Sequence, residues 1–62
     1  MQYIKKATVI SKKTLESNFE YFIRMPNRRM ISIFSEKDVM VGTEMYVLYD
    51  YINGEFQNVV FA

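Results

Sequence analysis

The chain contains no cysteine, no histidine and no tryptophan, and it has only one proline and two glycines among its 62 residues. Without cysteine it has neither a disulfide nor a thiolate metal site, a composition that fits a reducing compartment, so we expect a cytoplasmic protein. Without histidine and cysteine, the commonest general base and the most reactive nucleophile are missing, so we expect no enzymatic activity, no metal and no cofactor.

Long hydrophobic runs are also absent. The chain starts without an apolar segment of signal-peptide length, and no stretch approaches the length of a membrane-spanning helix, so we expect no membrane partner. A chain of this size predicts one small domain, 1–62, that buries only about 60% of the surface of its unfolded form. Because so small a core gives marginal stability, both a monomer and a homodimer remain open.

Aromatic residues are abundant instead, with five tyrosines and five phenylalanines. Two stretches rich in aromatic and β-branched residues flank Asn53-Gly54, a pair that tolerates the positive φ of a two-residue hairpin turn. We therefore predict strands at Glu44 to Tyr51 and Glu55 to Phe61, joined by a tight turn. The rest of the sheet is expected to build on this hairpin.

Three further strands are predicted, at Gln2 to Ser11, Phe19 to Met25 and Met30 to Phe34. The Lys5-Lys6 pair interrupts the first of them. Because lysines on an edge discourage unwanted strand pairing, this pair favours an edge position for that strand. Helical structure is limited to at most one turn, at Ser35 to Asp38, where a serine precedes an acid by three residues.

The alternation of apolar residues predicts how the second and third strands pair. A two-residue loop at Pro26-Asn27 would place Arg24 opposite Arg29, and facing like charges are destabilising. A three-residue loop instead pairs Ile23 with Ile31, which places Tyr21, Ile23, Met25, Ile31 and Ile33 on one apolar face. The opposite face then holds Glu20, Phe22, Arg24, Met30, Ser32 and Phe34. We predict the three-residue loop.

These elements predict an all-β fold, a five-stranded antiparallel sheet curled into a barrel or near-barrel. The segment from Val39 to Asp50, in which Gly42 leads into a strand rich in valine and tyrosine, resembles small five-stranded barrels of the OB and Src-homology types. The resemblance rests on residue classes and covers only this segment.

The charges divide unevenly along the chain. Residues 1–30 hold seven basic and two acidic side chains, whereas residues 31–62 hold one basic and five acidic side chains. Such a division indicates either a bipolar surface or two halves that attract each other within one fold.

The candidate site residues are Phe22, Arg24, Arg28, Arg29 and Met30. Arginine together with aromatic residues and methionine is typical of the centre of a protein interface. We therefore expect a non-enzymatic binding module, a small protein-binding regulator or inhibitor of the kind found among phage-type accessory proteins. The competing interpretation is that the arginines only solubilise a loop while Phe22 and Phe34 belong to the core.

The alternative function is nucleic-acid binding by a small barrel. In that case Lys5, Lys6, Lys12 and Lys13 would join the arginines on phosphates, with aromatic rings stacking on bases. The five acidic residues of the second half count against it, because phosphate neutralisation dominates such binding.

Overall fold

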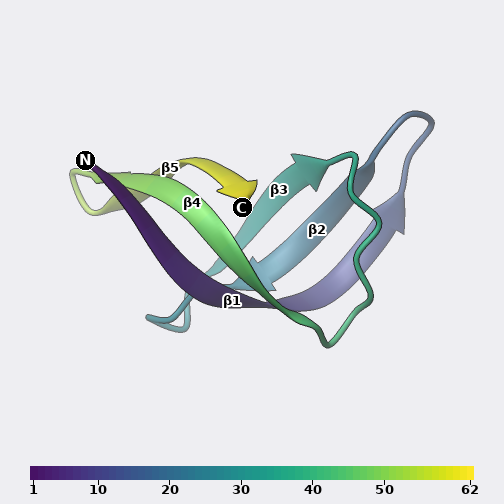
Figure 1. The fold of residues 1–62 in the computed structure, drawn as a ribbon, viewed down its shortest axis with the longest axis horizontal. Helices are drawn as coiled ribbons and strands as arrows, with labels where there is room; N and C mark the ends of the chain where they lie inside the picture. Colours follow the sequence, from purple (N-terminus) through teal and green to yellow (C-terminus); the bar gives the residue numbers. More distant parts are fainter.

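The computed structural model describes all of residues 1–62. It contains five strands and no helix: β1 (Gln2–Thr14), β2 (Phe19–Arg24), β3 (Met30–Ser35), β4 (Glu44–Ile52) and β5 (Glu55–Phe61). The strands form one antiparallel sheet in the order β3-β2-β1-β4-β5, and this sheet curls into a nearly closed barrel (Figure 1). The predicted all-β fold class is confirmed. No helical segment with the length and apolar character to cross a membrane is present.

The strand order explains how the barrel closes. β1, β2 and β3 form a meander, and β4 returns to lie beside β1, which is the spatial order 4-1-2-3 of a Greek key. β5 then extends the sheet beyond β4 and lies against β3, although these two strands share no ladder. Of the two barrel types that the sequence resembles, the OB type is a partly open Greek-key barrel and fits this order.

β1 is the central strand of the sheet, so the prediction of an edge position is wrong. Its N-terminal part pairs with β4 and its C-terminal part pairs with β2. The register shifts at Ile10, where a bulge lets this long strand bend from one half of the barrel to the other. The two lysines are tolerated because Lys5 lies beyond the buried core and Lys6 points outward; both are exposed. The strand also runs to Thr14, three residues past its predicted end.

The β2–β3 hairpin has the predicted register. Ile23 pairs with Ile31, and the N–H of Met25 donates to the carbonyl oxygen of Arg29 at 2.8 Å. The three-residue loop closes through a 2.8 Å hydrogen bond from the Arg28 N–H to the Met25 carbonyl. Arg28 has a φ of 70°. This left-handed conformation is typical of the last residue of a three-residue hairpin loop, a position that glycine usually occupies.

The β4–β5 hairpin also forms as predicted. Ile52 pairs with Glu55 across a two-residue turn, in which Asn53 has a φ of 51° and Gly54 a φ of 78°. Two consecutive positive φ values define the type I′ turn, whose twist matches that of the flanking strands. A third left-handed residue, Asn58 with a φ of 53°, accompanies a register shift further along β5.

The segment between β3 and β4 is irregular, and the helical turn allowed at Ser35 to Asp38 does not form. The Ser35 hydroxyl instead accepts a hydrogen bond from the Lys37 N–H at 3.1 Å, a local bond that replaces a helical one. Tyr21 holds this segment to the barrel: its hydroxyl donates to the Lys37 carbonyl at 2.6 Å and accepts from the Val39 N–H at 2.8 Å.

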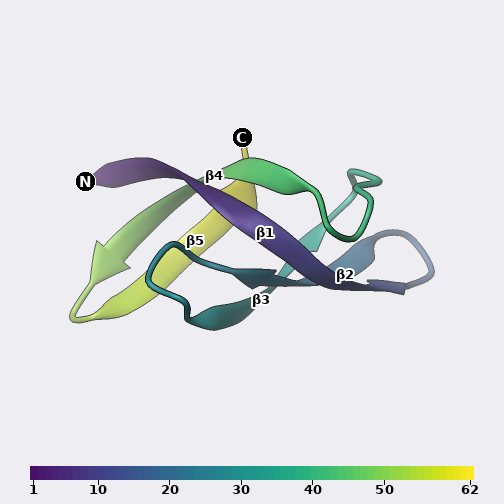
Figure 2. The ribbon, with the colours of Figure 1, turned by 90° about the horizontal axis from the view of Figure 1, so that it is seen from below.

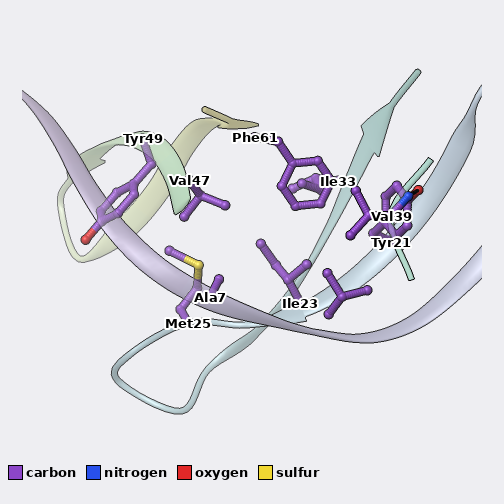
Figure 3. Packing of buried hydrophobic residues seen from close by; sticks show 10 residues of the cluster. Ala7, Tyr21, Ile23, Met25, Ile33, Val39, Val47, Tyr49 and Phe61 are labelled. Atoms are coloured by element: carbon purple, nitrogen blue, oxygen red, sulfur yellow. Dashed lines mark hydrogen bonds between the residues drawn. The ribbon is translucent and has the colours of Figure 1, made fainter. Parts of the chain in front are cut away.

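The core lies inside the curl of the sheet (Figure 3). Eight of its ten buried side chains come from the five strands, and Met25 and Val39 lie outside them: Ala7, Val9, Tyr21, Ile23, Met25, Ile33, Val39, Val47, Tyr49 and Phe61. Tyr21 and Phe61 meet edge to face with ring centroids 5.2 Å apart, which joins β2 to β5 across the barrel. No polar side chain other than the tyrosine hydroxyls enters this core, so apolar burial stabilises the fold as the composition requires.

Candidate functional site

Three large apolar side chains lie exposed together on the outer face of β2 and β3. Phe22 is 47% exposed, Met30 47% and Phe34 59%. Alternation along the strands places them on the other face of the sheet from the core residues. On this outer face, Arg24 is paired with Met30 on the neighbouring strand. The interpretation that Phe22 and Phe34 are core residues is therefore wrong: in this register their inward-pointing neighbours, Tyr21, Ile23 and Ile33, fill the barrel.

Two of the three arginines lie beside these apolar residues, and the third does not. Arg24 and Arg28 border a shallow depression together with Met30. The Arg29 side chain turns toward the other hairpin, where its Nη1 donates to the Gly54 carbonyl at 2.8 Å and its guanidinium carbon lies 5.8 Å from the centre of the Phe56 ring. We call Phe22, Met30, Phe34, Arg24 and Arg28 the outer patch.

The four lysines of the first strand do not form one surface. Lys12 makes an ion pair with Asp38 and lies 4.3 Å from the centre of the Phe19 ring, whereas Lys13 is directly opposite Glu20. Lys6 projects over the Tyr46 ring, at 5.6 Å from its centre. Lys5 faces the opposite side of β1, inside the open end of the barrel. The seven basic residues of the first half are thus distributed over several surfaces.

The open end of the barrel holds a hollow that the sequence did not predict. The N-terminal end of β1 and the turns of the β2–β3 and β4–β5 hairpins lie together at this end (Figures 1 and 2). Between them is a hollow of about 350 Å³, which we call the mouth hollow. It is lined by Tyr3, Lys5, Pro26, Asn27, Tyr49, Tyr51 and Phe56.

Aromatic rings form the wall of the mouth hollow. Tyr3 and Tyr49 stack with centroids 5.7 Å apart, and Phe56 meets Tyr49 and Tyr51 edge to face at 5.1 and 5.0 Å. The one sequence signal was that Tyr49 and Tyr51 share a face of their strand. Phe56 joins them through the β4–β5 hairpin, in which it lies opposite Tyr51, and Tyr3 joins them only through pairing of β1 with β4, two strands that are distant in the chain.

A comparison of the chain with family models, with curated proteins and with solved structures finds no match.

Proposed function

We propose that this protein is a non-enzymatic binding module that docks a partner protein through the outer patch. The partner surface that fits has an apolar centre bordered by acidic side chains. The observation that carries this proposal is the position of Phe22, Met30 and Phe34, which lie exposed on adjacent strands beside Arg24 and Arg28. Exposed apolar groups gathered on one face of a small monomer are typical of interaction sites.

The composition of the outer patch matches the residues that contribute most binding energy in protein interfaces. Aromatic side chains, methionine and arginine are enriched at interface centres, and truncation of a central residue costs 2 kcal/mol or more at hot spots. Glu20 lies at the border, where its Oε2 accepts a hydrogen bond from the Ser32 hydroxyl at 2.9 Å. The face thus combines three apolar side chains with charged residues at its two ends, and Ser32 lies opposite Phe22.

The backbone of Arg28 gives a second, independent argument. Its φ of 70° is unfavourable for a residue with a side chain, and glycine at this position would remove the cost. Strained residues of this kind cluster at functional sites. The presence of an arginine at the tip of the hairpin, despite the unfavourable backbone conformation, fits a role of its guanidinium in binding.

Nucleic-acid binding is the second candidate, because the OB-like Greek-key arrangement occurs in oligonucleotide-binding barrels. The distribution of charge favours the protein partner. Lys12 is paired with Asp38, Lys13 lies opposite Glu20, and Arg29 bonds the Gly54 carbonyl, so a continuous basic groove for phosphates is not assembled.

The test compares capture of proteins from the native host by the wild type and by two variants. Phe22→Asp is expected to abolish capture, while the matched variant Tyr46→Asp, which places the same charge on exposed Tyr46 of β4, is expected to retain it. Both variants should keep the far-ultraviolet circular dichroism spectrum of the wild type. Equal capture by Phe22→Asp and the wild type would disprove the proposed docking face.

A second measurement separates the two candidate functions. Fluorescence anisotropy with labelled single-stranded and double-stranded oligonucleotides at low salt is expected to show no saturable binding. Affinity that falls steeply with added salt and is reduced by Arg24→Glu and Arg28→Glu would instead support the nucleic-acid function.

A further inference from the structure

We propose that the mouth hollow is a second binding site, separate from the outer patch, and that it takes a planar aromatic anion of one or two rings. The two surfaces lie on opposite faces of the sheet. Tyr49 belongs to the inner face. Tyr3 lies opposite it in the β1–β4 ladder and Phe56 meets its ring edge to face, so the three rings form an aromatic wall at the end of the core. The volume of about 350 Å³ is near the lower end of the range for small-molecule sites.

The rings are arranged to receive another ring. Tyr3 is 39% exposed and Tyr51 45%, and both line the hollow. Tyr49 is buried, and its ring contacts those of Tyr3 and Phe56. Figure 3 shows Tyr49 at one end of the core, with its hydroxyl turned away from the other labelled side chains. Aromatic groups stack on such surfaces whatever their detailed structure, because every planar ring offers a π-face.

The charges around the mouth hollow select an anion. Lys5 lines the hollow, Arg29 lies over the Phe56 ring at its border, and no carboxylate is among the lining residues. A cluster of tyrosine and phenylalanine rings alone would also suit a quaternary ammonium ion. Lys5 and Arg29 would repel such a cation, so the charge of the site favours an anionic ligand over a quaternary ammonium ion.

Polar groups with free hydrogen-bonding capacity complete the site. Tyr21 is the only tyrosine whose hydroxyl bonds within the chain, so the hydroxyls of Tyr3, Tyr49 and Tyr51 are available to a ligand. The Asn27 Oδ1 accepts the Arg29 N–H at 3.1 Å, which leaves the Asn27 amide nitrogen free to donate to an anion at the rim.

The test is a titration followed by ¹H–¹⁵N correlation spectra, with indole-3-acetate as an aryl carboxylate and adenosine 5′-monophosphate as an aryl phosphate. Saturable shifts are expected at the amides of Lys5, Asn27, Tyr51 and Gly54, and the stronger of the two probes identifies the kind of anion. Indole-3-acetamide, which has the same rings and no charge, is expected to bind more weakly.

Two adjacent lysines provide a matched pair of variants. Lys5→Gln removes the cation inside the hollow, whereas Lys6→Gln removes the next cation along β1, which lies over Tyr46 on the outer face. Lys5→Gln is expected to weaken binding at least about threefold, and Lys6→Gln to leave it unchanged. Both lysines are exposed, so neither variant should unfold the protein.

Three results would overturn the proposal. They are the absence of saturable shifts with either anion up to about 5 mM, equal weakening by Lys5→Gln and Lys6→Gln, and tighter binding of phenyltrimethylammonium than of the anions. Loss of the outer-patch function does not affect this test, because none of the five outer-patch residues is changed or monitored in it.

Discussion

Arg29 joins the two hairpin tips of this barrel: its Nη1 donates a 2.8 Å hydrogen bond to the carbonyl oxygen of Gly54. The two residues are separated by 25 positions in the chain. Arg29 follows the β2–β3 loop and Gly54 lies in the β4–β5 turn, and the two hairpins share no ladder. The bond therefore links the β2–β3 half of the barrel to the β4–β5 half at the end where the mouth hollow opens.

Arg29→Ala is expected to loosen this end of the molecule without unfolding it. The lost hydrogen bond should lower the free energy of unfolding by about 1 kcal/mol and speed amide exchange at Asn53 and Gly54. Chemical denaturation and hydrogen exchange measure both effects. Arg24→Ala is the control, because Arg24 makes no hydrogen bond through its side chain, and an equal change in both variants would contradict the role of the bond.

Tyr21→Phe is expected to destabilise the fold although it removes only one oxygen atom. The hydroxyl bonds both the Lys37 carbonyl and the Val39 N–H, and its loss leaves the buried Val39 donor unsatisfied. The free energy of unfolding should fall by about 1–3 kcal/mol. Tyr46→Phe, at an exposed tyrosine, should have no measurable effect in the same denaturation experiment. Similar stability of the two variants would show that the Tyr21 bonds do not hold the 36–43 segment.

Phe22→Ser and Ile23→Ser test the assignment of faces in β2. Phe22 is half exposed and Ile23 is fully buried, although they are adjacent. Phe22→Ser should change the free energy of unfolding by less than about 1 kcal/mol, whereas Ile23→Ser should cost about 3–5 kcal/mol and abolish folding of so small a domain. Circular dichroism during thermal unfolding distinguishes the two. An unfolded Phe22→Ser variant would place Phe22 in the core.

Two substitutions at left-handed positions should have effects of opposite sign. Arg28→Gly is expected to raise the free energy of unfolding by up to about 1 kcal/mol, because glycine adopts a φ of 70° without steric cost. Gly54→Ala should lower it by about 1 kcal/mol, and a methyl group there would meet nothing within 4 Å, so the effect is purely one of backbone conformation. Destabilisation by Arg28→Gly would mean that the Arg28 side chain supports the fold.

Both hairpins could be predicted because each is encoded by neighbouring residues. Asn53-Gly54 specifies a two-residue turn, and the repulsion that would arise between Arg24 and Arg29 selects the three-residue loop of the other hairpin. The alternation also places Phe22 on the face opposite Tyr21 and Ile23, but whether that face is exposed or covered was left open by the sequence and is decided by the structure.

The position of β1 was not predictable from local sequence. Lys5 and Lys6 are typical of an edge strand, and only the bend at Ile10 and the pairing with β4 place this strand in the centre. The mouth hollow depends on the same long-range pairing, because Tyr3 and Tyr49 meet only across the β1–β4 ladder.

The central place of β1 also determines how the protein can be divided. A cut at the exposed Met40-Val41 bond would separate the β1–β3 meander from the β4–β5 hairpin, and a lone hairpin is at best marginally stable in water. The meander, in turn, would present the N-terminal half of β1 without its partner strand. Two such fragments carry complementary free edges, so the barrel is suited to serve as a split reporter whose halves regain structure only on reassociation.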